Sequence, residues 1–535
     1  MKLTTFFTFI LLVIFSSCTS KNSTQKTNKK PNIIYILADD MGYGDVGAYN
    51  IESKIKTPGL DKLASDGMMF TDAHTSSAVC TPTRYGILTG RYNWRSRLKS
   101  SVLGGSSKAL IPNSRATVAS ILKASGYHTA FIGKWHLGWD WALKDETKEI
   151  YKDEEELGDW YVDKKNIDFT RSVTNTPNDL GFEYAYGHCG SLDMDPYVYV
   201  ENGKPTAIPD TITGNKEKYT FWRKGDTAPD FIHEEVTPNF FRRGINYIKE
   251  QANNDKPFFL YLPLPSPHTP ILPTEEWQGK SDLNPYGDFV MMVDNYINQL
   301  QEAVKSAGIE ENTLIIFTTD NGCSPAADID SLILKGHYPN GIYRGHKADI
   351  FEGGHRIPFI AKWPAVIQKG TKNDQVICTT DLMATLADII DYSLQDDEGE
   401  DSYSMMPLFK GEKIEGTFRE ATVHHSIDGE FAIRKGDWKL IMCPSSGGWS
   451  FPRPRRDSAV IATLPPIQLY NLKNDPSEEN NLQAENTEKV QELKTLLAKY
   501  ILDGRSTPGV PQQNERTEDW KQIHWIDGRK DKNLH

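Results

Sequence analysis

The chain has 535 residues, of which 60 are Lys or Arg and 72 are Asp or Glu, so its formal net charge is −12. This length allows a large hydrophobic core and a second, smaller domain. The acidic balance argues against a nucleic-acid partner, because nucleic-acid binding needs a basic face that displaces counterions.

The N-terminus has the pattern of an export signal. Lys2 precedes the apolar run Phe6–Phe15, which is too short to cross a bilayer. Small residues stand directly before Cys18, as in the lipobox of bacterial lipoproteins. We therefore expect a signal peptide over 1–17, lipidation of Cys18 and a polar tether over 18–30, in a protein exported to the periplasm or anchored to the outer membrane. An ordinary cleaved signal with an incidental cysteine is the alternative.

From Pro31 onward, buried strands alternate with helices. Short β-branched apolar runs predict strands at 32–38, 127–133, 257–264, 313–319 and 358–364. Apolar periodicity and end signals predict helices at 57–67, 114–126, 238–251, 286–308 and 378–391. This alternation is typical of an α/β fold with a mostly parallel central sheet flanked by helices.

The pattern changes around residues 395–415, which are acidic and loop-like. Shorter alternating strands and one helix follow. They predict a smaller antiparallel sheet with a packed helix. The expected division is a catalytic domain over 31–405 and a C-terminal subdomain over 406–535.

The segment SSAVCTPTRYGILTGRY, residues 76–92, places Cys80 in the first turn of an expected helix. Pro82 suits that turn, where a helix has spare N–H groups. The helix dipole favours a polarised or anionic group at Cys80. Arg84, four residues on, lies on the same helical face. A buried cysteine that only packs is the alternative.

Oxygen ligands follow two of the expected strands. Asp39 and Asp40 come after the first strand, and Asp320 and Asn321 come after the strand at 313–319. In open α/β sheets, ligands gather beyond the carboxyl ends of the strands. Carboxylate and amide oxygens suit Ca²⁺ or Mg²⁺ better than zinc. Plain turns and caps at the same positions are the alternative.

Basic side chains follow the other expected strand ends. Lys134 and His136 are two residues apart and would lie on one side of an extended chain. His268 lies just past the strand at 257–264, and Lys347 precedes a Gly-Gly turn. With Arg84, these groups describe a pocket for a tetrahedral oxyanion. Taken singly, each histidine could be an ordinary structural residue.

The sequence CTPTR resembles the C-x-P-x-R signature of type I sulfatases, and LTGR follows it as in that family. Other blocks resemble the family in its order: ADDMGYGD, GYHTAFIGKWHLG, PHTP, TTDNG and GHKADIFEGGHRIPFIAKWP. The similarity extends over nearly all of 31–511. It implies an alkaline-phosphatase-like α/β fold with a small C-terminal domain, and it implies hydrolysis of sulfate esters.

In that family the signature cysteine is oxidised to formylglycine, whose hydrate attacks sulfur. The resemblance implies this modification of Cys80 and makes a sulfatase-maturing enzyme a partner. It also implies one Ca²⁺ per chain, held by Asp39, Asp40, Asp320 and Asn321 together with the modified Cys80.

The resemblance also implies roles for the basic residues. Arg84 would hold the diol, and Lys134 and Lys347 would neutralise the sulfate. His268 would protonate the leaving alcohol. His136 would take the proton of the second hydroxyl, so that the sulfated intermediate collapses.

Residues outside the shared chemistry are the candidates for substrate binding. We expect the substrate to be a sulfated polysaccharide or oligosaccharide, with a local pocket for a terminal sugar, because the acidic charge argues against a long basic track. The candidates are Asp193, Tyr197, Arg344, His346, His424 and His425, and the resemblance adds Ser191, at a position where some members of the family have a pocket serine. Helix caps and solvated surface groups are the alternative for each.

Two other functions remain open. A phosphodiesterase or phosphonate hydrolase of the same superfamily would carry extra metal ligands, typically a histidine where this chain has Asn321. A non-catalytic glycan-binding lipoprotein would be expected to have lost some polar catalytic residues, and none is missing here.

Overall fold

The computed structural model describes residues 30–148, 151–153, 159–517 and 520–526. The predicted signal peptide, Cys18 and all of the predicted tether except Lys30 lie outside these ranges. Among the described helices, none is both long and apolar enough to span a bilayer.

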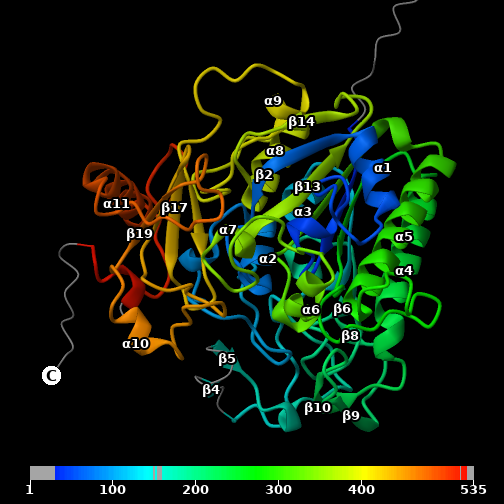
Figure 1. Ribbon diagram of the computed structural model, residues 1–535. Helices are drawn as coiled ribbons and strands as arrows, with labels where there is room; N and C mark the ends of the chain where they lie inside the picture. The colour runs from blue at the N-terminus through cyan, green and yellow to red at the C-terminus, as the bar shows by residue number, and fades with distance from the viewer. Residues whose placement is uncertain (1–29, 149–150, 154–158, 518–519, 527–535) are drawn as a thin grey trace, which may run out of the picture.

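A large twisted sheet forms the centre of the molecule (Figure 1). Its strands are β1 (Asn32–Ala38), β2 (Met68–His74), β3 (His128–Lys134), β6 (Tyr184–His188), β7 (Val200–Glu201), β8 (Lys204–Pro205), β11 (Phe258–Pro263), β12 (Thr313–Thr319), β13 (Arg356–Lys362), β14 (Thr371–Asn373) and β15 (Ile377–Cys378). The spatial order is β14-β2-β13-β12-β1-β11-β3-β6-β7-β8, with β15 also on β2. The five strands from β12 to β6 run parallel, whereas β13 is antiparallel to both of its neighbours.

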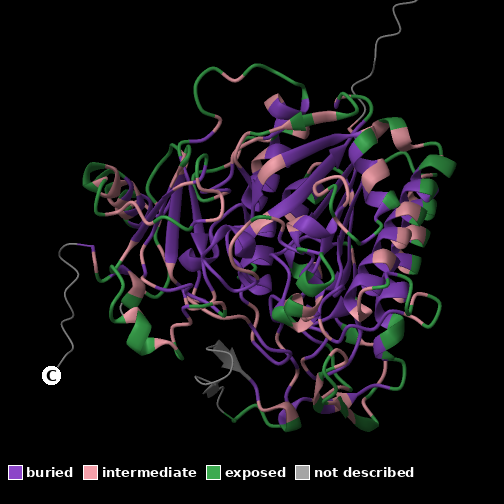
Figure 2. Ribbon diagram, viewed as in Figure 1, coloured by how far each residue is buried: buried purple, intermediate pink, exposed green. Residues whose placement is uncertain are grey.

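The central strands are buried on both faces, as their apolar sequences predict. Ile34 of β1 lies opposite Ile315 of β12 and Leu260 of β11, and all three side chains are inaccessible to solvent. Strands of this kind need cover on both faces of the sheet. Figure 2 shows the resulting buried centre, with exposed residues confined to the outer surfaces of the helices and to loops.

Helices supply that cover. The helices α1 (Pro58–Asp66), α4 (Val236–Gln251) and α5 (Pro285–Ser306) pack together along one side of the large sheet (Figure 1). The helices α2 (Cys80–Thr89), α3 (Val118–Ala124) and α8 (Leu382–Ile389) form a second packed group. Shorter helices are α6 (Ile329–Leu334), α7 (Glu352–His355) and α9 (Met406–Phe409).

A second sheet lies in the C-terminal part of the chain. It contains β16 (Thr422–His425), β17 (Phe431–Lys435), β18 (Trp438–Ile441) and β19 (Gln468–Asn471), all antiparallel. The helix α11 (Thr487–Leu502) packs on β17 and β18, and the short helix α10 (Ser458–Ile461) lies before β19. The predicted mostly parallel sheet with flanking helices and the predicted antiparallel C-terminal sheet are thus confirmed.

Two small hairpins complete the described elements. They are β4 (Tyr151–Asp153) with β5 (Asp159–Tyr161), and β9 (Thr211–Asn215) with β10 (Trp222–Thr227). The short helix α9 belongs to the core of the large sheet, where Phe409 packs edge-on against Phe70 of β2 with ring centroids 6.1 Å apart. The expected domain boundary between residues 405 and 406 stays a prediction.

Candidate active site

The predicted metal ligands meet at one edge of the large sheet. Asp39 and Asp40 follow β1, and Asp320 and Asn321 follow β12, which is the parallel neighbour of β1. The Asp40 N–H donates to Asp320 Oδ1 at 3.3 Å, and Asn321 Nδ2 donates to Asp40 Oδ1 at 2.7 Å. All four side chains are buried. Parallel pairing therefore brings the four groups together, as expected from their positions at strand ends.

The donor set fits a hard cation. Asp39 Oδ1, Asp40 Oδ2 and Asn321 Oδ1 are buried and have no hydrogen-bond partner among the described residues. Asp39, Asp40 and Asp320 each offer a carboxylate oxygen, and these three oxygens lie within 4.8 Å of one another. Buried oxygens without partners are costly unless something coordinates them. Oxygen-only coordination of this kind is typical of Ca²⁺.

The helix α2 begins at Cys80, as expected, and is buried along its whole length. Arg84, one turn later, donates from Nη2 to Asp320 Oδ2 at 3.0 Å and to Asp39 Oδ2 at 3.1 Å. Its Nη1 donates to the Lys134 carbonyl at 2.9 Å. Arg84 thus ties the helix that carries Cys80 to the carboxylates of two strands.

The two predicted lysines contact the same carboxylates. Lys134, at the end of β3, donates to Asp39 and also to Ser191 Oγ at 3.1 Å. Lys347 Nζ lies 2.6 Å from Asp40 Oδ1. Both ammonium groups therefore lie beside the expected cation site, where an anionic substrate group would also meet them.

His268 borders the same cluster. Its Nε2 lies 3.6 Å from Asp40 Oδ2, and its ring lies 3.5 Å from Ser191 Oγ. Asp39, Cys80 and His268 offer atoms within 4.8 Å of one another. The structure thus brings His268 and Ser191 to the Cys80 site.

The backbone at His136 does not have the extended conformation that the sequence predicts. Its backbone φ is +55°, so the chain after Lys134 is not extended. Its N–H donates to the Cys189 carbonyl and its Nε2–H to the Leu103 carbonyl, both at 2.7 Å. This tautomer leaves Nδ1 as an acceptor, and Nδ1 is buried without a described partner.

The electrostatics follow from burial and close charges. Burial opposes ionisation of Asp39, but Lys134, His268 and Arg84 hold the pKa of its carboxyl well below the usual range. Burial and the neighbouring Asp39 raise the pKa of Asp320 to about 7. Burial lowers the pKa of His268, with Lys347 adding to the effect, and burial followed by Lys134 lowers the pKa of His136 well below its usual value.

Burial raises the pKa of the Cys80 thiol to about 11. The thiolate is the nucleophilic form of cysteine, so an unmodified Cys80 is protonated and unreactive at neutral pH. Burial among these groups therefore disfavours the thiolate of an unmodified Cys80.

Two further candidates lie beside Ser191. Asp193 is buried and accepts from Arg223 Nη1 at 2.5 Å, while its Oδ1 has no partner among the described residues. Tyr197 is also buried, and its hydroxyl donates to the carbonyls of Asp193 and Arg223 at 3.1 and 2.6 Å. Asp193 Oδ1 is therefore an unused acceptor, whereas the Tyr197 hydroxyl is bonded to the backbone. Sequence reasoning missed Arg223, which belongs to no motif and meets Asp193 only through folding.

Arg344 and His346, the candidates nearest to Lys347 in the sequence, have different partners. Arg344 Nη1 donates to the Glu478 carbonyl at 2.7 Å, and its guanidinium lies 3.8 Å from the ring centroid of Phe351. His346 stays partly exposed beside Lys347, and its Nδ1–H donates to the Lys347 carbonyl at 3.0 Å. Arg344 thus bonds the segment before Lys347 to the segment after β19, and both Arg344 and His346 are half-buried.

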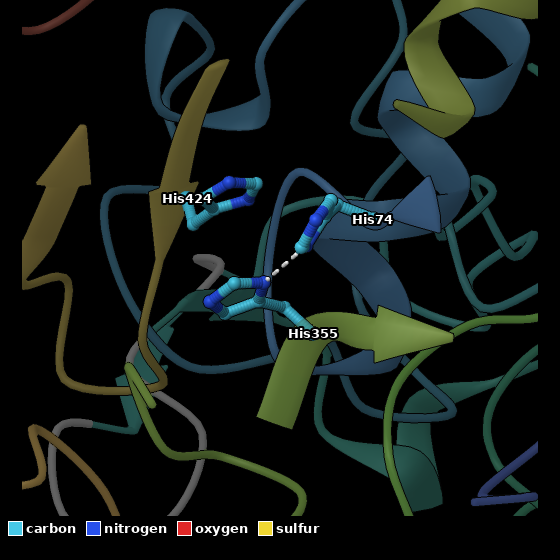
Figure 3. Close-up of side chains that lie close together, drawn as sticks. All are labelled: His74, His355 and His424. Atoms are coloured by element: carbon cyan, nitrogen blue, oxygen red, sulfur yellow. Dashed lines mark hydrogen bonds between the residues drawn. The ribbon is translucent and has the colours of Figure 1, made fainter. Parts of the chain in front are cut away.

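The structure does not bring His424 and His425 to the site. Figure 3 shows His424 grouped with His74 and His355, and its ring stacks on His355 with centroids 4.0 Å apart. His424 Nδ1–H donates to the Thr75 carbonyl at 2.9 Å. The His425 ring is buried against Phe431. Both side chains pack into the junction of the two sheets, because β16 closes directly over the chain that leads to Cys80.

The trio His74, His355 and His424 is also not arranged as a cation site. His355 Nε2 lies 2.9 Å from Lys439 Nζ, and His74 Nε2 lies 2.7 Å from Asp72. His74 Nδ1 lies 3.0 Å from His355 Nδ1. The imidazoles therefore use their nitrogens on one another and on protein groups, beside a buried ammonium.

A cation site flanked by buried ammonium groups is chemistry for an anionic ester, and its place at the carboxyl ends of a parallel sheet is that of a metal-dependent ester hydrolase. The protein-family model described as Sulfatase matches residues 31–392. The chain therefore belongs to the sulfatase family and is a sulfuric ester hydrolase with the alkaline-phosphatase-like fold of that family, as predicted.

Individual relatives agree with this assignment. The chain is 33% identical to an N-acetylgalactosamine-6-O-sulfatase of Bacteroides thetaiotaomicron over 530 residues, covering 91% of this chain and 96% of the relative. It is 31% identical to human arylsulfatase A, covering 92% of each chain. A solved structure from work on glycosaminoglycan metabolism by Bacteroides thetaiotaomicron superposes with a TM-score of 0.75 at 31% identity, covering 88% of this chain and 99% of that one.

Proposed function

We propose that this sulfatase removes sulfate from a sugar hydroxyl, using a nucleophile made from Cys80 and one Ca²⁺. The observation that carries the proposal is the joint placement of an unreactive buried thiol and three unpartnered ligand oxygens within one cluster. A thiol enzyme would not need such oxygens, and a two-metal phosphatase would need further ligands.

Asp39, Asp40, Asp320 and Asn321 would hold the Ca²⁺, with the modified Cys80 beside them. Bound Ca²⁺ supplies Lewis-acid attraction for a sulfate oxygen and favours the ionised form of a nearby hydroxyl. Oxidation of Cys80 to formylglycine would supply a hydrated aldehyde in place of the protonated thiol. A sulfatase-maturing enzyme is therefore the expected partner.

The lysines would bind the substrate anion. Lys134 and Lys347 lie against Asp39 and Asp40, which fixes both ammonium groups before any substrate arrives. Fixed charges in a buried site stabilise developing charge without reorganisation. Arg84 is held by two carboxylates, so its role is to position them and the start of α2.

The two histidines would move protons. His268 is the one of the pair with some exposure, so a leaving sugar oxygen can reach it, and the negative charge of a bound sulfate ester favours its protonated form. His136 keeps its Nε2–H on the Leu103 carbonyl, which leaves Nδ1 to accept a proton within the buried cluster.

Two observations support the proposed substrate class: the name of one relative and the unpartnered oxygen of Asp193. The Bacteroides thetaiotaomicron relative acts on N-acetylgalactosamine 6-O-sulfate by its name. In this chain, Asp193 with its unpartnered Oδ1 lies beside Ser191 and could accept hydrogen bonds from sugar hydroxyls. A hexosamine 6-O-sulfate at the end of a glycan is therefore the substrate that we propose, with His346 at the edge of its pocket.

We also propose that the protein is exported and held by a lipid on Cys18, as its first residues indicate. A tethered enzyme outside the cytoplasm would meet large glycans there. Metabolic labelling with a fatty-acid analogue, compared between the natural chain and Cys18→Ala, tests this directly. Equal labelling of both proteins would overturn it.

Sulfate release from a panel of sulfated mono- and oligosaccharides tests the main proposal. The protein should be made with a maturing enzyme, its Cys80 state checked by mass, and Cys80→Ala run in parallel. We expect release from hexosamine 6-O-sulfates. Faster turnover of phosphate diesters or phosphonates would favour the superfamily alternative, and glycan binding without turnover by fully modified protein would favour a binding role.

A further inference from the structure

A loop of the C-terminal subdomain is bonded to the backbone that carries Lys347. This loop, residues 446–456, is called the rim segment below. Asp349 Oδ1 accepts the N–H groups of Trp449 and Ser450 at 2.7 and 2.9 Å. The same carboxylate, through Oδ2, accepts the N–H of His346 at 2.9 Å. Asp349 is fully buried and stands two residues after Lys347, the predicted sulfate-binding lysine. It thus bonds the rim segment to the backbone beside Lys347.

A second set of bonds joins the rim segment to the other side of the site. Arg455 Nη2 lies 3.6 Å from Asp428 Oδ1, and the Asp428 N–H donates to the Gly447 carbonyl at 3.3 Å. The preceding Ile427 accepts the Ser101 N–H at 2.7 Å, two residues before the Leu103 carbonyl that orients His136. The rim segment is therefore linked to the backbone near Lys347 through Asp349, and to the backbone before Leu103 through Asp428 and Ile427.

The rim segment exposes two aromatic rings and a cation. Trp449 is 43% exposed and Phe451 is 60% exposed, and the Arg455 side chain is 82% exposed. The segment SGGWSFPRPRR contains no acidic residue, in a chain whose net charge is −12. Two aromatic rings and an exposed cation thus stand within one segment of eleven residues, where rigid apolar faces and a charge are offered together.

In the described part of the chain, the exposed aromatic residues lie on segments that are bonded to segments of the site. Those that are exposed there are Phe221, Tyr338, Trp449 and Phe451. The Phe221 carbonyl accepts from Thr269 Oγ1 at 3.4 Å, directly after His268. Tyr338 precedes Pro339, whose carbonyl accepts the Gly44 N–H at 2.6 Å in the segment after Asp40. Exposed rings are thus attached to several of the segments that build the site rather than scattered over the surface.

We propose that Trp449, Phe451 and Arg455 form a subsite for the sugar next to the sulfated one, in a glycan whose neighbouring sugar carries a carboxylate or sulfate. This deepens the proposed function and rests on it. The rings offer rigid apolar faces on which the C–H face of a pyranose can lie. Arg455 offers a planar fork that pairs with a carboxylate or sulfate. Asp428 lies 3.6 Å from the guanidinium, and most of the Arg455 side chain stays open to solvent.

The test compares a short and a long substrate. The long one is a tetrasaccharide in which N-acetylgalactosamine 6-sulfate alternates with a uronic acid, and the short one is N-acetylgalactosamine 6-sulfate alone. We expect Trp449→Ala to raise KM for the tetrasaccharide about five- to tenfold, as truncation of a central aromatic contact does, with kcat little changed. KM for the monosaccharide should stay within about twofold.

Two control variants distinguish the loss of a sugar contact from a general loss of folding. Leu502→Ala removes a 52% exposed apolar side chain at the end of α11 in the same subdomain and should change neither KM. Trp449→Phe keeps a ring and should retain most of the tetrasaccharide affinity. If Trp449→Ala changes both substrates equally, or neither, the subsite does not exist as proposed.

The role of the Arg455 charge is tested by measuring the affinity for the tetrasaccharide. Calorimetry with the tetrasaccharide on a Cys80→Ala background measures affinity without turnover. We expect Arg455→Ala to weaken binding about three- to tenfold and to reduce its dependence on salt, because an exposed ion pair is screened. Lys499→Ala on α11 is the control, and equal effects of the two substitutions would overturn the role of Arg455.

The two proposals fail in different ways. If modified protein with native Trp449 releases sulfate from neither sugar, the proposed function is wrong. If it releases sulfate from the monosaccharide and gains no affinity on the tetrasaccharide, the proposed function stands and the subsite is wrong.

Discussion

Nη2 of Arg84 lies 3.0 Å from Oδ2 of Asp320, and both side chains are inaccessible to solvent. The same nitrogen lies 3.1 Å from Oδ2 of Asp39. One guanidinium therefore joins the carboxylates that follow β12 and β1, and it stands on the helix that begins at Cys80. This cation therefore holds the helix that begins at Cys80 and the strand ends with the proposed metal ligands as one unit.

Removing the Arg84 side chain should therefore lower the free energy of unfolding as well as the activity. Breaking a buried ion pair leaves an uncompensated charge and costs about 3–5 kcal/mol. Urea unfolding of unmodified Arg84→Gln measures this without any need for maturation. Arg171→Gln, which breaks an exposed pair with Glu146, should cost less than about 1 kcal/mol. Similar losses in the two variants would contradict the structural role of Arg84.

Cys80→Ala should fold and lose several orders of magnitude in kcat, because a covalent nucleophile acts together with its partners. Protein made without a maturing enzyme should be comparably inactive, since burial raises the pKa of the Cys80 thiol to about 11 and keeps it protonated. Intact mass before each assay reports the state of residue 80. Substantial activity in folded Cys80→Ala would exclude the mechanism.

Ca²⁺ should stabilise the folded protein. A ligand that binds only the native state adds about 2.7 kcal/mol when its concentration is 100 times Kd. Thermal unfolding with and without Ca²⁺ should show this gain in the natural protein and a much smaller one in Asp320→Asn. Asp66→Asn on α1 is the control. Elemental analysis that finds two zinc ions per chain would instead support the phosphatase-like alternative.

His268→Ala should impair substrates according to their leaving groups. A sugar hydroxyl needs a proton as it leaves, so its hydrolysis should fall about 10²- to 10⁴-fold. An activated aryl sulfate releases a stable phenolate and should be affected far less. His128→Ala, which removes a partly exposed histidine paired with Glu183, should spare both. An equal loss on the two substrates would remove His268 from the acid role.

Ionisation of Glu430 should lower the free energy of unfolding as pH rises. Burial, with the nearby Asp428, raises the pKa of Glu430 from 4.5 to about 7. A carboxyl whose pKa is raised on folding stabilises the native state below its unfolded pKa, and this contribution is lost as pH rises through the folded value. Glu430→Gln should therefore reduce the fall in unfolding temperature between about pH 5 and about pH 8. Glu302→Gln, on the exposed face of α5, should not, and identical pH profiles for the natural protein and Glu430→Gln would contradict the assignment.

The sequence by itself determined the central strands, the longer helices and the chemistry at the ends of these strands. The apolar run at 32–38 and the helix predicted at 286–308 matched β1 and α5, because local periodicity reports which faces of an element are buried. Asp39 and Asp320 could be expected to meet, since the carboxyl ends of adjacent parallel strands share an edge. The signature around Cys80 predicted the start of α2 and the family.

Only the tertiary structure decided which surfaces face one another. Sequence reasoning placed His424 and His425 at the substrate, but β16 packs against the chain before Cys80 and buries both. It expected Lys134 and His136 on one side of an extended chain, whereas the φ of His136 is positive. It did not single out Asp349, whose carboxylate holds the rim segment beside Lys347. Spacing along the chain encodes local geometry, while contacts between distant segments depend on how whole layers pack.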